Sequence, residues 1–155
     1  MNGKWLMIGI LAFTAVFTAG LVYSQFFGFY DEIDDVTQID LAGQTLPVHD
    51  YQGIDAASSG LKLRACFRLG KDATDTTIDP VELMLLPKPA TPTPLNPPYW
   101  FDCFDAAELT EDLASGRAFS VLAEENELDG IDRIVAFYPS GRGYMWRQLN
   151  EKYQD

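Results

Sequence analysis

The feature that most constrains the fold is an uncharged segment near the start of the chain. Residues 5–30 contain no Asp, Glu, Lys or Arg, whereas Lys4 precedes them and four of the next five residues are acidic. A helix of about 20 apolar residues spans the ~30 Å hydrocarbon core of a bilayer. Trp5 and Tyr23 stand where the two membrane–water interfaces would lie. Residues 1–30 are therefore predicted to form a transmembrane anchor.

Basic residues near the segment indicate its orientation. Apart from the amino group, the nearest positive charges are Lys4 before the segment and Lys62 well after it. Since positive residues favour the cytoplasmic side, we expect a cytoplasmic N-terminus in a bacterial inner membrane and a periplasmic remainder. A cleavable signal peptide is the alternative, because Val22 and Ser24 have small-residue spacing for cleavage before Gln25. The apolar run exceeds the ~7–15 residues of a signal peptide's apolar h-region, which favours an uncleaved anchor.

The charge of residues 31–155 limits the kinds of partner. All 23 acidic residues and ten of the eleven basic ones lie there. Nucleic acids and anionic lipid surfaces bind clusters of Lys and Arg, so we do not expect this part of the chain to bind nucleic acid. Its length suits one ordinary domain, and its apolar and aromatic content is too high for disorder.

The chain has two cysteines, Cys66 and Cys103. Periplasmic thiols are oxidised, and two cysteines in one small domain pair most simply with each other. Closing a loop of about 37 residues stabilises a fold by roughly 4 kcal/mol in the chain-entropy model. Because no CxxC redox motif is present, the pair is interpreted as a structural disulfide.

Hydrophobic patterning predicts an α+β domain with one main helix on a small antiparallel sheet. Asp105 and Glu108 have the spacing of a capping box, and the helix is expected over residues 106–115 with Gly116 as its stop. Residues 50–53 are interpreted as a turn. Strands are expected over residues 36–41, 46–48, 61–69, 81–86, 118–123, 131–138 and 143–149.

A proline-rich segment interrupts this pattern. Residues 87–98 contain six prolines, a density that excludes a helix or a central strand. The segment is predicted to be an extended surface loop. It is either a docking ligand for another protein or a stiff connector leading to Cys103, and the connector is favoured.

The strand over residues 61–69 places basic side chains on one face. Lys62, Arg64 and Arg68 alternate with apolar residues and share their face with Cys66. An anion-binding stripe is one interpretation. A solvated outer face braced by the disulfide is the other, and it is favoured.

Residues for catalysis or metal binding are sparse. His49 is the single histidine, which leaves zinc catalysis without ligands and a Ser–His–Asp triad without an alternative base. Residues 125–130 resemble the start of a calcium loop, but its twelfth position would be Ala136 instead of Glu. They are interpreted as a charged turn. No cofactor, no metal and no enzymatic activity are expected.

Aromatic and arginine residues are concentrated in the last two strands, and these residue types are enriched at interface hot spots. Tyr144 and Trp146 share one face of their strand and Arg147 lies on the other, and the pattern does not say which face is exposed. The candidate interaction residues are Trp100, Arg133, Arg142, Tyr144, Trp146 and Arg147.

Several blocks of sequence carry a family resemblance: residues 1–4, 64–67, 94–105, 124–126, 130–136 and 141–150. In this order they resemble an uncharacterised family of short alphaproteobacterial proteins with an N-terminal membrane anchor. The resemblance covers nearly the whole chain and implies no established activity. Members are sometimes labelled histidine kinases, but this chain lacks nucleotide-binding glycine motifs, and His49 lies in a turn-rich stretch.

Together these patterns predict a non-enzymatic, single-pass protein. Its periplasmic domain is expected to be an accessory, assembly or interaction module for another membrane or periplasmic protein. The alternative is a ligand-sensing or solute-binding domain, with Trp100, Arg64 and Arg68 holding an anionic small molecule. A third possibility, an unrecognised hydrolase or redox enzyme, would need His49 to face a second polar group in a cleft.

Overall fold

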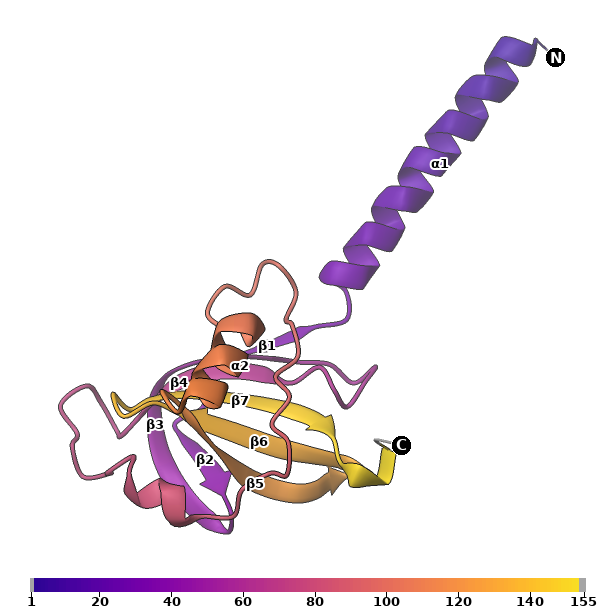
Figure 1. Ribbon diagram of the computed structural model, residues 1–155. Coiled ribbons are helices and arrows are strands. Elements are labelled where there is room, and N and C mark those ends of the chain that lie inside the picture. Colours follow the sequence, from indigo (N-terminus) through magenta and orange to yellow (C-terminus); the bar gives the residue numbers. More distant parts are fainter. Residues whose placement is uncertain (1, 154–155) are drawn as a thin grey trace. The chain divides into compact units, whose positions relative to one another are not determined.

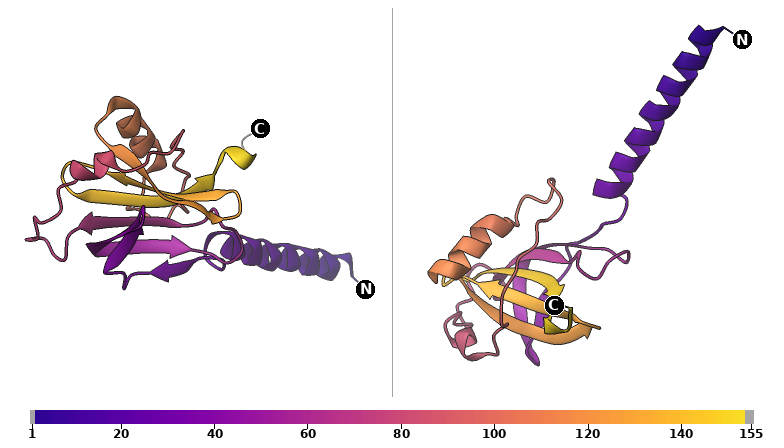
Figure 2. Two further views of the ribbon diagram at one scale, coloured as in Figure 1. Left: turned by 90° about the horizontal axis from the view of Figure 1, so that it is seen from below. Right: turned by 45° about the vertical axis from the view of Figure 1, so that its right-hand side comes forward.

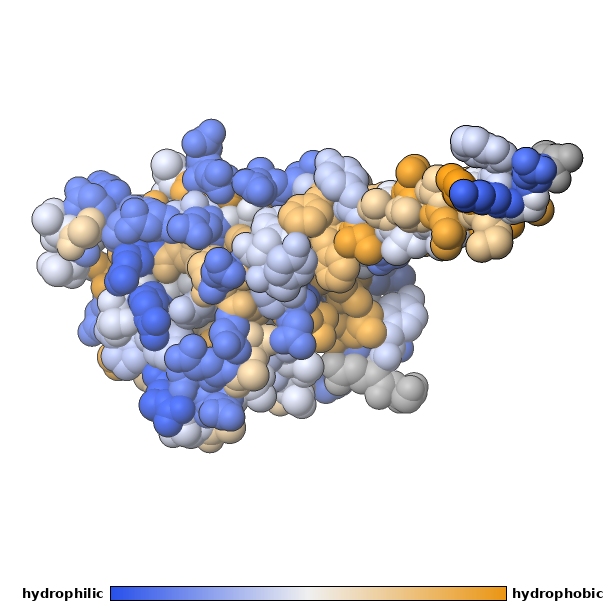
Figure 3. Space-filling view, turned by 90° about the horizontal axis from the view of Figure 1, so that it is seen from above, coloured by the Kyte–Doolittle hydropathy of each residue, from blue (hydrophilic) through white to orange (hydrophobic). Residues whose placement is uncertain are grey.

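The chain divides into two compact units, Met1–Tyr30 and Asp31–Asp155. The computed structural model describes residues 2–153. The first unit consists of α1, Gly3–Phe26 (Figure 1), in which no residue is buried. Its 24 residues extend about 36 Å, and the helix is long and apolar enough to cross a membrane. Figure 3 shows hydrophobic residues along α1 and hydrophilic residues over much of the sheet domain.

The second unit is an antiparallel sheet of seven strands with one α-helix, α2 (Ala106–Ser115), which confirms the predicted α+β class. The strand order is β1-β3-β4-β7-β6-β5, and β2 also pairs with β3. Two short 3-10 helices, η1 (Glu82–Leu85) and η2 (Glu151–Tyr153), complete the described part. The strands are β1 Asp31–Ile33, β2 Gln38–Leu41, β3 Gln44–Asp55, β4 Arg64–Leu69, β5 Phe119–Leu128, β6 Ile131–Phe137 and β7 Arg142–Leu149.

The sheet curls until its two ends approach each other. Figure 2 shows β2, β3 and β4 in one layer and β5, β6 and β7 in the other. Ala42, directly after β2, donates its amide to the carbonyl of Ala123 in β5 at 2.8 Å. The side chains enclosed between the layers form the main core and include Leu41, Val48, Phe67, Val121, Val135, Phe137 and Met145.

The outer face of β6 and β7 is also covered. The ring of Phe104, just before α2, lies 6.3 Å from that of Trp146 and 5.8 Å from that of Tyr144. Trp146 is fully buried as a result. The proline-rich loop is attached beside it by the amide side chain of Gln148, which accepts from Thr93 N at 2.7 Å.

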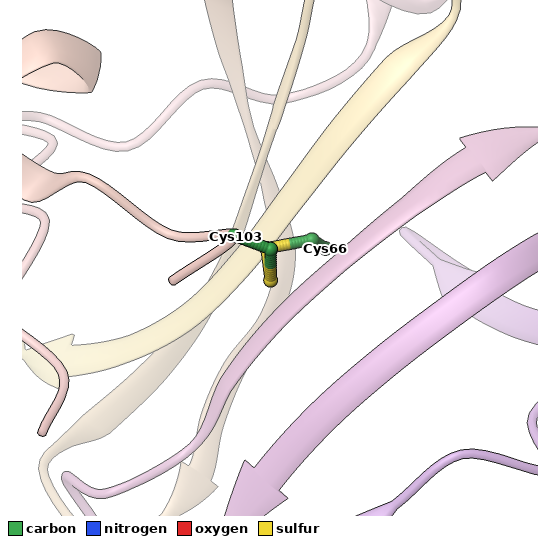
Figure 4. Close-up of a disulfide and its surroundings, with 2 residues drawn as sticks. All are labelled: Cys66 and Cys103. Carbon is green, nitrogen blue, oxygen red and sulfur yellow. A yellow bond between two sulfur atoms is a disulfide. The ribbon is translucent and has the colours of Figure 1, made fainter. Parts of the chain in front are cut away.

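The predicted disulfide joins Cys66 to Cys103, with Cα atoms 6.2 Å apart. Figure 4 shows Cys66 on β4 and Cys103 on the segment leading into α2. The bond therefore attaches the end of the proline-rich connection to the outer face of the sheet.

Local sequence signals predicted α2 correctly. The Asp105 carboxylate accepts from the amides of Ala107 at 2.9 Å and Glu108 at 3.0 Å, which caps the first turn. Gly116 takes the left-handed conformation, φ 78°, at the C-terminal end. Both helix ends agree with the prediction.

The turn predicted at residues 50–53 is wrong, because β3 continues through it. Asp50 has φ 50°, and the register with β4 shifts between His49 and Gln52. A β-bulge absorbs the extra residue, so turn-forming residues occur inside one long strand.

Two further assignments are corrected. Residues 81–86 are not a strand: η1 forms there because Asp79 Oδ1 accepts from Val81 N at 2.8 Å, which starts a helical turn. The charged turn predicted over residues 125–130 is also shorter than expected. β5 runs on to Leu128, so only the residues after it reverse the chain before β6.

Candidate functional site

The candidate interaction residues do not share one surface. Arg133 and Arg147 lie on the inner face of the sheet, which Val135 and Met145 also occupy. Tyr144 is half-buried on the opposite face, beneath Phe104, and Trp146 is fully buried there. Trp146 therefore cannot contact a partner unless Phe104 is displaced.

Arg133 and Arg147 instead meet at one carboxylate. Arg133 Nη1 lies 2.7 Å from Glu127 Oε1, and Arg147 Nε lies 2.6 Å from Glu127 Oε2. The two arginines are direct neighbours across β6 and β7. Both side chains are only 16% exposed, so the pairs are largely shielded from water.

Further acidic groups extend this network to other strands. Arg147 Nη1 lies 2.8 Å from Asp55 Oδ2, and Arg133 Nη2 lies 3.1 Å from Glu124 Oε2. Burial raises the pKa of the neighbouring Tyr51 to about 12 even though Arg133 opposes the shift, so its phenol stays neutral. The network joins β3, β5, β6 and β7, and its charges are used to hold these strands together.

A second polar cluster links α2 to the sheet. Tyr138 Oη donates to Asp112 Oδ2 at 2.6 Å, and Arg117 Nε donates to Asp112 Oδ1 at 2.6 Å. These contacts, the tyrosine bond first, hold the pKa of Asp112 below its usual range. The guanidinium of Arg142 lies over the Tyr138 ring, 4.5 Å from its centroid. Arg142, another candidate interaction residue, therefore also makes a contact inside the domain, with Tyr138.

Arg64 contradicts both interpretations of the basic stripe. It is only 4% exposed, so it is neither on a solvated face nor open to an anion. Its Nε donates to the carbonyl of Leu95 at 2.6 Å and its Nη1 to that of Leu61 at 2.8 Å. The proline-rich loop covers this face, leaving Arg68 exposed and Lys62 half-buried.

Trp100 lines a cleft of about 500 Å³ whose lining is acidic. Glu32, Asp34 and Asp102 contribute carboxylates, and neither Arg64 nor Arg68 takes part. The structure therefore does not bring Trp100 together with the two arginines required for the anionic-ligand alternative.

His49 lies in a separate cleft of about 570 Å³. Its Nδ1 donates to the carbonyl of Gly70 at 3.1 Å, and its Nε2 is 3.8 Å from the Asp50 carboxylate. Within residues 2–153, His49 Nε2 is buried and has no hydrogen-bond partner. No hydroxyl or thiol in that range is bonded to it, as a nucleophile–base pair would require.

The same cleft is rich in carboxylates. Asp50, Asp72, Asp75 and Asp79 line it together with one arginine, Arg68. The hydroxyl of Thr77 donates to Asp75 and is the largest cause that lowers the Asp75 pKa to about 2. No group of three His, Cys, Asp or Glu residues among positions 2–153 is arranged to hold a metal ion.

Three residues central to these clusters were missed in the sequence: Glu127, Asp112 and Gln148. Extending the strand as far as Leu128 would have paired Leu128 with Ile131 and Glu124 with Arg133, and Glu127 lies between those two pairs. Asp112 and Gln148 gave no comparable signal, because their partners lie on other elements.

The fold and its clusters define a small α+β domain preceded by an apolar helix. Residues 34–155 match a family of unknown function, DUF6446, and the chain belongs to that family. The matched region begins after the apolar helix. No curated protein and no solved structure matches the chain.

Proposed function

We propose that the chain is a single-pass protein of a bacterial inner membrane whose periplasmic domain, residues 31–155, is a non-enzymatic protein-interaction module. The observation that carries this proposal is α1. Its 24 residues contain one charged side chain, Lys4, and none of them is buried. A helix that is apolar all round is unfavourable in water and suits lipid.

The disulfide supports an oxidising location for the domain. A Cys66–Cys103 bond persists where thiols are not kept reduced, as in the periplasm. Lys4 and the amino terminus then lie on the cytoplasmic side, where positive residues are favoured. Both features agree on one orientation.

Binding is favoured over catalysis because the polar groups at the centre of the domain are engaged with each other. Arg133 and Arg147 are neutralised by Glu127 and its neighbours, and Asp112 is bonded to Tyr138 and Arg117. A catalytic group must instead face substrate with free bonding capacity. Clusters whose polar groups are already paired with one another stabilise a scaffold.

Reporter fusions test the orientation. Alkaline phosphatase, which is active only after export, is fused behind residue 155, and a cytoplasmic fluorescent reporter is fused there in a parallel strain. We expect phosphatase activity and no fluorescence, and the reverse pattern would overturn the proposed topology. Mass spectrometry of the mature N-terminus shows whether the chain is cut before Gln25.

Purification of the full chain in mild detergent tests the interaction. We expect a specific membrane or periplasmic protein to co-purify with it. The matched control joins residues 1–30 to an unrelated periplasmic domain and should lose that protein. Recovery of a monomer alone, in cells that express the chain at its native level, would contradict an interaction role.

A further inference from the structure

Three apolar side chains are displayed together just before the proline-rich loop. Val81 is 55% exposed, Met84 41% and Leu85 89%. We call these three residues the η1 tip, since they belong to η1 and the residue that precedes it. Singly exposed apolar residues are ordinary, but adjacent ones form a patch of the kind found at interaction sites.

The backbone of the η1 tip is anchored to the core and to the sheet. Leu83, between its members, is only 6% exposed and belongs to the main core. Asp79 Oδ1 accepts from the amide of Val81 at 2.8 Å, which fixes the start of the turn. Beyond the tip, Leu122 in β5 donates its amide to the carbonyl of Pro87 at 2.8 Å. The backbone that carries the exposed side chains is thus held in place, which lowers the entropy lost when a partner binds.

One side of the η1 tip is acidic. Glu82 is exposed within η1, and Asp79 and Pro80 lead directly into the cleft that also contains His49. That cleft adds the carboxylates of Asp50, Asp72 and Asp75. Arg68 is the one Lys or Arg among the residues that line this cleft, so carboxylates outnumber basic groups there.

We propose that the η1 tip and its acidic side form a docking site for a protein segment whose apolar side chains are flanked by Lys or Arg. The proposal rests on the interaction role above and names the chemistry of the partner. An apolar centre with a charged rim is the usual anatomy of an interface, and complementary charge steers the encounter. A second copy of this chain would bring acidic rims together, and an anionic lipid surface would be repelled likewise.

Site-specific crosslinking of the full chain tests the site. A photoreactive benzoylphenylalanine replaces Leu85 in the organism that encodes the chain, and the same group replaces Leu128 as a control. Leu128 is an exposed leucine, at 43%, on β5. We expect position 85 to capture one protein strongly and position 128 to capture it weakly. The crosslinked peptide of that protein should carry Lys or Arg within a few residues of the attachment point.

Charge reversal tests the acidic side. Glu82→Lys should lower the crosslinking yield at position 85 by about fivefold or more, because a favourable charge contact becomes repulsive. Glu111→Lys, an exposed change on α2, should leave the yield unchanged. Equal melting temperatures of both variants and the parent show that the fold is intact.

The outcomes separate this site from the general interaction role. Capture of lipid, of a second copy or of an acidic segment at position 85 would overturn the site, as would an unchanged yield in Glu82→Lys. If position 85 captures nothing while position 128 captures a protein, the interaction role stands and the proposed docking site at the η1 tip is wrong. If neither the two positions nor detergent purification yields a partner, both proposals fail.

Discussion

Arg133 and Arg147 face each other across β6 and β7, and each binds a different oxygen of the Glu127 carboxylate. Like charges directly opposite each other destabilise a sheet. One shared carboxylate from β5 turns that repulsion into a link between three strands. Glu127 is therefore expected to matter more for stability than its position near a hairpin turn would suggest.

Replacing Glu127 with Gln should lower the free energy of unfolding by about 2 kcal/mol, since two charge-assisted hydrogen bonds weaken and two shielded arginines remain adjacent. Urea unfolding of the full chain in detergent measures the change through tryptophan fluorescence. Glu125→Gln is the control, because Glu125 is exposed on the same strand. Similar losses in both variants would show that Glu127 is an ordinary surface residue.

The bond from Tyr138 to Asp112 predicts a dependence of stability on pH. The Asp112 pKa is lower in the folded chain than its usual value. Its contribution is therefore present above the unfolded-state pKa of about 3.9 and is lost as the pH falls through the folded pKa. Asp112→Asn should make the free energy of unfolding less sensitive to acid.

Unfolding by urea at a series of pH values between about 6 and 3 checks this, because that range brackets the unfolded-state pKa. Glu111→Gln, an exposed change on the same helix, is the control and should follow the parent. A parallel loss of stability with acid in the Asp112→Asn variant and the parent would contradict the assignment.

Removal of the disulfide should destabilise the domain. Cys66→Ser or Cys103→Ser is expected to lower the free energy of unfolding by ~2–5 kcal/mol, because the unfolded chain regains the freedom of the closed loop. Melting under non-reducing conditions measures it, and the parent treated with reductant should approach the variants. A variant that melts with the oxidised parent would show that the bond does not form.

Gln148 should control how firmly the proline-rich loop is held. Its Oε1 accepts from Thr93 N at 2.7 Å and Trp146 Nε1 at 3.0 Å. Gln148→Leu leaves both donors unpaired and should cost about 3 kcal/mol. Hydrogen exchange at Thr93 should then accelerate, whereas Gln38→Leu, an exposed change in β2, should leave it unchanged. Slow exchange at Thr93 in both variants would mean that other contacts hold the loop.

The fold was predicted best where the determinants are local. Asp105 and Gly116 cap α2 through their own conformations and nearest amides, so a short window of sequence contains the whole signal. The strand predicted over residues 46–48 is much shorter than β3, because the bulge at Asp50 uses residues that also make turns. Telling a bulge from a turn requires the partner strand β4, which the local pattern does not include.

The clusters were predicted less well because they depend on which elements cover which face. Arg64 was expected outside the core by strict alternation, and it does lie on the outer face of β4. The proline-rich loop then buries it, a contact between positions 31 residues apart. Trp146 is covered in the same way by Phe104, which lies 42 residues before it in the chain. Alternation assigns a side to each residue but does not say whether that side is covered.

The place of β7 between β4 and β6 has a consequence for synthesis of the protein. β3 and β4 form one ladder early in the chain and β5 and β6 another, but no continuous ladder connects the two until β7 has left the ribosome. Folding that waits for distant segments is slow and leaves strand edges open. α1 emerges before every strand, so a helix apolar enough to cross a membrane is complete while the sheet is still two separate ladders.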